Sequence, residues 1–456
     1  MRFSDYLSVL ILLLVIDPLW SQGIQISETH PQYWTYDGQL TLLLGGSNED
    51  NLFQMPGVEQ HLDTLVACSG NYVRCTMSSR DSGNSWPFFW DAKTGKYDLN
   101  KWDQIYWKRF ADFLRWTAER DIVVQIEIWA TFDFYRDNWD ANPFNPKNNS
   151  TYSFQRTELL DTIPTHPIYA DNPFFTSVPA LRNNMKCLEY QQRFVDKILS
   201  HSLQYDHILY CMDNETSVSA SWGKFWADYI HKRAIEANKL VHCTEMWDPW
   251  DLDHIAHRES FDHPEIYDFV EISQNNHHRG EQHWKNGKAQ IDRLKKLGNL
   301  RPVTNIKIYG SDGGRHGGDD LDAIEKFCRN ILFGASSARF HRPTSGIGLN
   351  ASAQQVIQSM RMSTDAVDFF NMEPSENLDD CEENEAYLRG KAGAEYLIYF
   401  TGPGQVSVTE EGEWSIRWLN IMHHTWNSPQ DLIAQAGKIS VNTPSEGSWI
   451  AVLQKK

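Results

Sequence analysis

The chain has 456 residues, of which 41% are hydrophobic and 22% charged, so it can bury a large core. Its formal net charge of -18 argues against nucleic acid as a partner, because phosphate backbones are bound by basic surfaces. The chain also contains 18 tryptophans and 18 tyrosines. Most of these belong in a core, but aromatic faces also stack on sugar rings, which favours a carbohydrate partner.

The first residues are typical of an export signal. Arg2 supplies a positive charge, Leu7–Ile16 is an apolar run, and Ser21–Gly23 offers a cleavage point. The apolar run is too short to span a bilayer comfortably, and no second such run follows. We therefore expect residues 1–22 to be a signal peptide and the protein to be secreted or periplasmic, with no integral membrane segment.

Neither the cysteines nor the histidines show the spacing of a metal site. The seven cysteines form no CxxC pair, and no HxH or HExxH motif is present. Cys75, Cys211 and Cys243 lie in apolar runs, where cysteine behaves as a small hydrophobic residue. The sequence predicts no metal and no cofactor.

Strand-like runs that end in polar clusters alternate with helical periodicity through most of the chain. The first two runs are Leu40–Leu44 and Tyr72–Met77, with helical spacing between them at Val58, Leu62 and Leu65. Strands are expected near residues 42, 73, 125, 209, 242, 270, 304 and 339. Eight such units predict a (β/α)8 TIM barrel over residues 23–370.

The pattern changes after the acidic stretch Glu373–Glu385. Short runs of period two follow, among them Tyr396–Phe400 and Trp449–Leu453, and glycine-containing turns separate them. We expect residues 371–384 to be a linker and residues 385–456 to form a small antiparallel β-sandwich domain.

The fourth predicted strand, Ile208–Met212, ends in Asp213-Asn214-Glu215. In a parallel barrel the C-terminal ends of the strands form the face where active sites lie. A glutamate there can donate and recover a proton beside a glycosidic oxygen, and Asn214 can bind a neighbouring hydroxyl. The structural alternative is a polar strand end that caps the next helix.

Four motifs in order resemble the apiosidase-like barrel hydrolases. They are Tyr36-Asp37-Gly38, Leu43–Gly46, Gly95–Leu99 and Asp213-Asn214-Glu215. These hydrolases belong to the glycoside hydrolase clan with acid/base and nucleophile carboxylates on strands four and seven. The period-two segments are similar to the module labelled a collagen-binding domain, which recurs behind such barrels. The resemblance covers nearly all of the chain after the signal.

The resemblance implies that Glu215 is the general acid/base, that Asn214 binds a sugar hydroxyl and that Arg74 lies near the nucleophile. Strand seven departs from the pattern, because Pro302–Lys307 carries Lys307 where these hydrolases place the nucleophilic glutamate. A lysine cannot form a glycosyl ester. Its ammonium would also lower the pKa of Glu215, which is unfavourable for an acid unless another anion intervenes.

A second carboxylate is therefore needed, and Asp312 lies only five residues beyond Lys307. We expect Asp312 to be the base of an inverting hydrolysis, with the two carboxyl groups roughly 6.5–9.5 Å apart to admit a water. Glu245 and Glu271 are the rival carboxylates. Lys307 then fits best as a cation that binds substrate.

Basic side chains gather at the ends of three adjacent strands, which predicts binding of sulfate or carboxylate groups. The alternative is that these cations pair with nearby acids and only shape the loops. The residues expected to bind substrate are Arg74, Asn214, Glu245, Trp247, His277, His278, Lys307, Arg315 and His316.

The sequence predicts an exported glycoside hydrolase that cleaves a plant or algal polysaccharide or oligosaccharide, with an anionic glycan as a candidate substrate. One alternative is a polysaccharide lyase that uses Tyr309 or a histidine as its base. The other is a sugar-binding barrel that has lost the strand-seven nucleophile and catalyses nothing.

Overall fold

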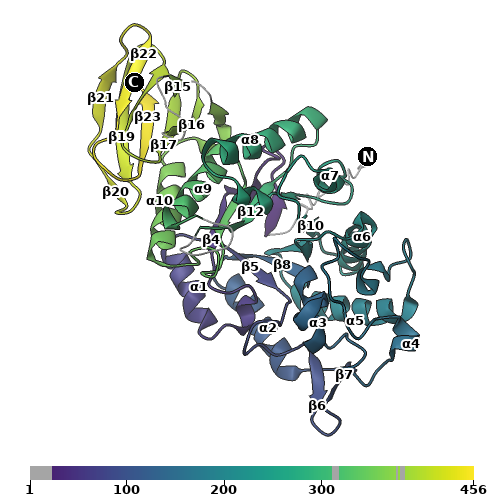
Figure 1. Cartoon of the computed structure of the whole chain (residues 1–456). Helices are drawn as coiled ribbons and strands as arrows, with labels where there is room; N and C mark the ends of the chain where they lie inside the picture. Colours follow the sequence, from purple (N-terminus) through teal and green to yellow (C-terminus); the bar gives the residue numbers. More distant parts are fainter. Residues whose placement is uncertain (1–22, 311–317, 376–377, 380–385) are drawn as a thin grey trace, which may run out of the picture.

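The computed structural model describes residues 23–310, 318–375, 378–379 and 386–456. Eight parallel strands pair in the order β10-β9-β8-β5-β4-β13-β12-β11 and form a nearly closed barrel (Figure 1). Their bounds are β4 (Leu43–Gly46), β5 (Tyr72–Thr76), β8 (Val123–Ala130), β9 (Ile208–Asn214), β10 (His242–Thr244), β11 (Val270–Glu271), β12 (Val303–Ile308) and β13 (Ser337–Phe340). The predicted (β/α)8 barrel is confirmed.

Helices surround the strands. Four of them begin after an aspartate or asparagine whose side chain accepts a hydrogen bond from the backbone three residues on, at Asp103, Asn184, Asp319 and Asn350. The main helices are α1 (Val58–Ala67), α2 (Gln104–Ala118), α5 (Met185–Ser202), α6 (Ala220–Glu236), α7 (Ile255–Phe261), α8 (Gly280–Leu297), α9 (Asp320–Phe333) and α10 (Ala351–Thr364). No helix in these ranges is long and apolar enough to cross a membrane.

A small antiparallel sheet closes the N-terminal end of the barrel. Its strands are β1 (Ile24–Ile26), β2 (Trp34–Tyr36) and β3 (Gln39–Thr41), so the first run predicted at residues 40–44 is divided between this sheet and β4. Trp34 packs with the first residues of several barrel strands and meets Phe269 edge to face at 5.3 Å. The barrel interior is thus a packed core, and the opposite end carries the site.

The long connection after β8 forms an ordered wall at that opposite end. It contains η2 (Thr131–Phe134), α3 (Arg136–Ala141), α4 (Phe154–Thr157) and η3 (Pro173–Thr176). Aromatic side chains hold it together, since Phe134 stacks on Phe174 at 3.9 Å and both contact Trp129 edge to face. Burial of these rings fixes the wall against the barrel.

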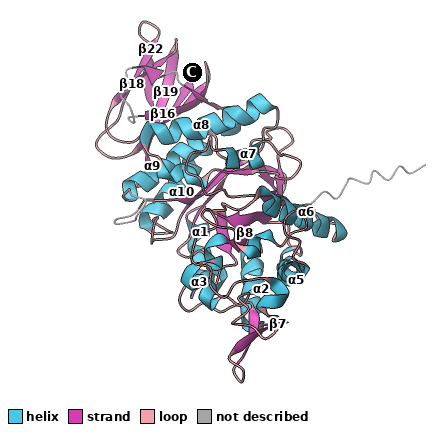
Figure 2. Cartoon of the chain, turned by 45° about the vertical axis from the view of Figure 1, so that its right-hand side comes forward, coloured by secondary structure: helices cyan, strands magenta, loops and turns pink. Residues whose placement is uncertain are grey.

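Two antiparallel sheets form the C-terminal domain, beside α8, α9 and α10 (Figure 2). The larger sheet contains β14 (Glu373–Ser375), β16 (Ala386–Lys391), β17 (Glu395–Phe400), β19 (Glu413–Asn420), β20 (Thr425–Trp426), β21 (Gln430–Ile433) and β23 (Trp449–Lys455). The smaller contains β15 (Leu378–Asp379), β18 (Gln405–Thr409) and β22 (Lys438–Asn442). Strands β14 and β15 lie within the stretch expected to be a linker.

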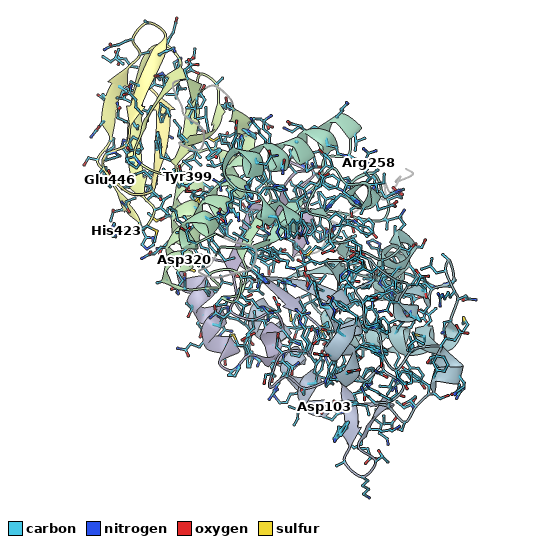
Figure 3. The ribbon with its side chains drawn as sticks, viewed as in Figure 1. Asp103, Arg258, Asp320, Tyr399, His423 and Glu446 are labelled. Atoms are coloured by element: carbon cyan, nitrogen blue, oxygen red, sulfur yellow. The ribbon has the colours of Figure 1, made fainter. Side chains whose placement is uncertain are left out.

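Strand β17 is buried on both faces, so its alternate residues serve two interfaces. Tyr396, Ile398 and Phe400 belong to the core between the two sheets. Leu397 and Tyr399 instead join the barrel's hydrophobic cluster, and Figure 3 places Tyr399 at the junction with the barrel helices. The sandwich is therefore packed firmly on the barrel.

Gly45 tests the packing of the barrel wall, because a Cβ atom there would lie 1.8 Å from the carbonyl oxygen of Tyr72. Strand β4 would have to move away from β5 to remove this steric clash. We expect Gly45→Ala to lower the free energy of unfolding by about 3 kcal/mol or more, at or above the upper range for overpacking. Urea denaturation measures this, with Gly402→Ala as the control, since a Cβ there meets nothing within 4 Å. Equal stability of the two variants would contradict the close β4–β5 contact.

Candidate active site

A cavity of about 370 Å³ lies at the C-terminal end of the barrel. The connection after β8 supplies one side of it, and the ends of four strands supply the other. The lining residues are Phe132, Tyr135, Arg136, His166, Ile168, Tyr169, Glu215, Asp248, Trp250, Gln274, His277 and Tyr309. A larger hollow of about 760 Å³ is an open groove on the outer surface over α5 and α6, away from the strand ends.

Glu215 follows β9 and is only 9% exposed. Its Oε1 atom accepts hydrogen bonds from Gln274 Nε2 at 3.2 Å and from the Tyr309 hydroxyl at 3.3 Å, and it forms an ion pair with Lys307 Nζ. Lys307 also donates to Asn214 Oδ1 at 3.1 Å. Within the described chain no donor is hydrogen-bonded to Oε2, and Glu215 is one of the residues that line the cavity. The backbone of Glu215 is left-handed, with φ of 56°, a strained conformation that is common at functional sites.

The surroundings of Glu215 hold it as a carboxylate. Burial raises its pKa, but the ammonium of Lys307 and the guanidinium of Arg74 outweigh burial, so the pKa lies below its usual value. The geometry therefore disfavours the expected role of Glu215 as a general acid, because an ionised carboxylate has no proton to give.

Asp248 is a second carboxylate in the same cavity, and sequence reasoning did not assign it to the site. It is half-buried, and its Oδ2 atom accepts a hydrogen bond from the Ser217 hydroxyl at 3.1 Å. Burial raises its pKa, and the negative charge of Glu215 raises it further, while His166 opposes the shift. None of the described lysines or arginines forms an ion pair with it.

The pairing of chain segments beyond β9 and β10 explains why Asp248 faces the cavity. Thr216 forms a parallel bridge with Trp247, and the Asp248 amide donates to the Thr216 carbonyl at 3.0 Å. Met246 lies in the barrel interior, so Asp248, two residues later, continues on the same face. The alternation of side chains along this segment would have predicted that Asp248 faces the cavity, once the face of Met246 was known.

Glu245 and Trp247 occupy the other face and do not line the cavity, contrary to expectation. Glu245 is fully buried, and its Oε1 atom accepts the amide protons of Asp213 at 2.8 Å and Met246 at 3.1 Å. The Trp247 indole donates to the Ser260 hydroxyl at 2.7 Å. Both side chains therefore stabilise the packing of the barrel.

Arg74 lies in an ionic network beneath the cavity. It is fully buried, with NH1 at 2.9 Å from Asp50 Oδ1 and NH2 at 2.7 Å from Glu127 Oε2. Asp50 also contacts Arg342 Nε at 3.1 Å. Despite burial, these cations hold the pKa of Asp50 well below its usual value. Arg74 supports the site electrostatically and does not line the cavity.

The expected cluster of cations is only partly directed at the cavity. His277 lines it and stacks on Trp250 with ring centroids 4.0 Å apart, whereas His278 lies outside the lining and contacts the Trp250 carbonyl at 3.2 Å. Arg279 lies 3.7 Å from Asp322. Asp312, Arg315 and His316 lie outside the described residues.

Arg136 is a cation of the cavity that sequence reasoning missed. It is exposed, it lines the cavity, and its guanidinium lies 5.3 Å from the centre of the Tyr135 ring. Within the described chain no acid pairs with it. Arg136 lies in a long irregular connection without helical or strand periodicity. The sequence therefore could not predict that its side chain faces the cavity.

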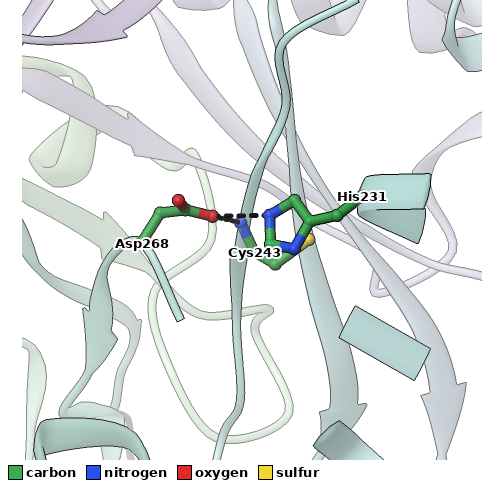
Figure 4. A group of neighbouring side chains, drawn as sticks. All are labelled: His231, Cys243 and Asp268. Atoms are coloured by element: carbon green, nitrogen blue, oxygen red, sulfur yellow. Dashed lines mark hydrogen bonds and ion pairs between the residues drawn. The ribbon is translucent and has the colours of Figure 1, made fainter. Parts of the chain in front are cut away.

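A separate cluster lies on the outer side of the barrel wall and consists of His231, Cys243 and Asp268 (Figure 4). Asp268 Oδ2 lies 3.0 Å from His231 Nε2 and accepts the Cys243 amide at 2.7 Å. These residue types also bind metals. Hydrogen bonds account for the cluster, which joins α6, β10 and the residues before β11 where direct strand pairing is interrupted.

No protein-family model matches the sequence, and no curated protein matches it. Solved structures resemble the fold. A glycoside hydrolase has a TM-score of 0.64 at 10% identity, over 95% of this chain and 97% of that chain. A glycoside hydrolase family 5 protein from Bacteroides vulgatus has a TM-score of 0.61 at 12% identity, over 95% and 93%. A family 5 mannosidase from Rhizomucor miehei has a TM-score of 0.51 at 12% identity, over 75% and 97%. The likeness shows a barrel fold shared with these hydrolases.

Buried carboxyls near the site predict how stability changes with pH. Burial raises the pKa of Asp213 to about 8 and that of Glu271 to about 8, so the folded chain binds these protons more tightly than the unfolded chain. Their contribution to stability is complete below the unfolded-state values of 3.8 and 4.5 and is lost as pH rises toward 8.

We expect wild type to lose stability relative to Glu271→Gln between pH 5 and pH 8, because in this range the unfolded wild-type chain releases the Glu271 proton while the folded protein keeps it, and the glutamine has no such proton. Urea denaturation of both proteins across this range measures the difference. A difference that does not change with pH would show that Glu271 titrates normally.

Proposed function

We propose that this protein hydrolyses a glycosidic bond of a carbohydrate bound in the cavity around Glu215. The observation that carries the proposal is the presence of two carboxylates, Glu215 and Asp248, from neighbouring strand ends in one cavity. Most glycosidases act through a pair of carboxyl groups that flank the bond. The fold shared with known glycoside hydrolases supports the same reaction.

Exposed apolar side chains at the cavity support a sugar ligand. Tyr169 is 77% exposed and Trp250 is 54% exposed, and both belong to the lining. Large exposed aromatics around a hollow are typical of ligand-binding surfaces, and their faces suit the apolar faces of pyranose rings. The Oδ1 atom of Asn214 accepts a hydrogen bond from Lys307, so we assign Asn214 to positioning of that ammonium.

We further propose an anionic substrate, with a carboxylate or sulfate group directed at Arg136. Arg136 offers a guanidinium to the cavity, and guanidinium forms paired hydrogen bonds with such groups. His277 adds a second basic side chain to the lining. Lys307 does not serve this purpose, because it is engaged with Glu215. Three further points stay predictions from the sequence. They are that the glycan comes from plants or algae, that the protein is exported, and that it is of the apiosidase-like subtype.

Hydrolysis is favoured over elimination by the state of Tyr309. Burial and the charge of Glu215 raise the pKa of its hydroxyl well above the usual value, and the hydroxyl already donates to Glu215. A hydroxyl of this kind is a poor base for removing the proton that a lyase must take. A lyase would release an unsaturated product that absorbs in the ultraviolet.

Screening of neutral, uronate-bearing and sulfated polysaccharides with product analysis tests the activity. We expect saturated reducing ends, and Glu215→Gln should lower kcat/KM on the active glycan by roughly 10²–10⁴-fold, as loss of an acid/base group does. Unchanged circular dichroism controls for folding. Full activity of Glu215→Gln would make Glu215 structural, and binding without cleavage by the wild type would favour the sugar-binding alternative.

Arg136 tests the charge of the substrate. We expect Arg136→Gln to raise KM for the charged glycan about tenfold or more, since one charge-assisted hydrogen bond contributes about 1.5–3 kcal/mol. Arg156→Gln is the matched control, because Arg156 is exposed on α4 of the same connection and lies outside the lining. Equal KM values for the charged glycan and for its desulfated or carboxyl-reduced form in the wild type would indicate a neutral substrate.

A further inference from the structure

We infer that the two carboxylates act in the reverse of the order that the family resemblance implies. Asp248 donates a proton to the departing glycosidic oxygen, and Glu215 removes a proton from the attacking water. The inference rests on the proposed function and adds a catalytic role for Asp248.

The contacts of Glu215 suit a proton acceptor. Three donors, from Lys307, Gln274 and Tyr309, converge on its Oε1 atom. Protonation of this carboxyl would leave a buried ammonium beside a neutral group, which is unfavourable. The Oε2 atom accepts no hydrogen bond from the described residues and is available to a water in the cavity. One oxygen is thus fixed while the other is left to act.

The contacts of Asp248 suit a proton donor. Only the Ser217 hydroxyl donates to its carboxyl among the described residues, at 3.1 Å. The groups whose charge reaches it are Glu215, His166 and Lys307, and of these Glu215 has the largest effect. A carboxyl that is half-buried beside a fixed anion retains its proton to a higher pH than a free aspartate does. The surroundings raise the pKa of Asp248 and lower that of Glu215, as a proton donor and a proton acceptor respectively require.

Lys307 is a positioning residue in this arrangement. It extends from β12 to Glu215 and Asn214 at the end of β9, and its side chain is almost completely buried. It occupies the strand-seven place of the missing nucleophile, but it acts on the substrate only through the charge state of Glu215. Arg74 lowers the pKa of Glu215 from beneath in the same way.

The step balances in protons and electrons. The water oxygen forms a bond to the anomeric carbon as the bond to the glycosidic oxygen breaks, and the bonding pair leaves with that oxygen. Glu215 takes the proton of the water, and the Asp248 proton passes to the leaving oxygen. Glu215 then loses its proton to solvent and Asp248 regains one. Because the water attacks the face opposite the leaving oxygen in a single displacement, the product forms with inversion at the anomeric carbon.

Leaving-group dependence separates the two roles. The probes are the active glycan from the screen and the 2,4-dinitrophenyl glycoside of the sugar it releases, since a dinitrophenolate leaves without a proton. Asp248→Asn should lose roughly 10²–10⁴-fold in kcat/KM on the glycan and retain most activity on the aryl glycoside. Glu215→Gln should lose activity on both, because the water still needs a base. Asp137→Asn, an exposed acid on α3 outside the lining, is the matched control.

The pH profile gives an independent readout. In wild type, kcat/KM should fall below the pKa of Glu215, when the base is protonated, and above the pKa of Asp248, when the acid is ionised. The upper limb should appear on the glycan and be absent on the aryl glycoside, whose leaving group needs no proton from Asp248. Lys307→Met should move the lower limb to higher pH, which a purely structural lysine would not do.

Several results would overturn the inference. They are an aryl glycoside spared by Glu215→Gln but not by Asp248→Asn, wild-type activity of Asp248→Asn on both probes, or net retention by proton NMR at early times. A wild type that cleaves no glycan of the screen would instead overturn the proposed function itself. Circular dichroism and thermal melting of each variant show that a loss of activity does not come from unfolding.

Discussion

The ion pair between Lys307 and Glu215 is the interaction on which the rest of the site depends. It joins β12 to the end of β9 across the mouth of the barrel, and both side chains are nearly excluded from water. Removal of one partner of a buried pair costs about 3–5 kcal/mol, because it leaves an unpaired charge. The pair therefore favours the anionic form of Glu215, and in the reaction that we propose the proton for the leaving group comes from another residue. Among the described residues that line the cavity, Asp248 is the other carboxylate.

The fold places this pair where chemistry is possible. Trp34 closes the N-terminal end of the barrel, and the network of Arg74, Asp50 and Glu127 fills the space directly beneath the cavity with paired charges. The aromatic wall after β8 then covers one side of the opening. None of the described sandwich residues lines the cavity, and the sandwich joins the barrel's hydrophobic cluster through residues of β16, β17, β19 and β23.

Periodicity in the sequence was enough to predict the barrel, the sandwich and the position of Glu215 at a strand end. The effect of Lys307 on the pKa of Glu215 was expected from the family resemblance, which puts Lys307 at the place of the strand-seven carboxylate, and the ion pair between the two residues agrees with it. Glu245 and Trp247 were expected to bind substrate but do not line the cavity. The side that each residue faces depends on the register of β10 with β9 and on the bridge between Thr216 and Trp247. Arg342 pairs with Asp50, far away in the chain, and no local pattern shows such a contact. Asp312, Arg315 and His316 stay predictions.

The division of charge between the two carboxylates is the central claim, and a direct titration tests it. Carbon-13 NMR of protein labelled at the side-chain carboxyl of glutamate and aspartate, assigned with Glu215→Gln and Asp248→Asn, follows each group from low to high pH. The account predicts that Glu215 titrates below its usual value of 4.5 and Asp248 above its usual value of 3.8. A Glu215 carboxyl that holds its proton to a higher pH than Asp248 would contradict it.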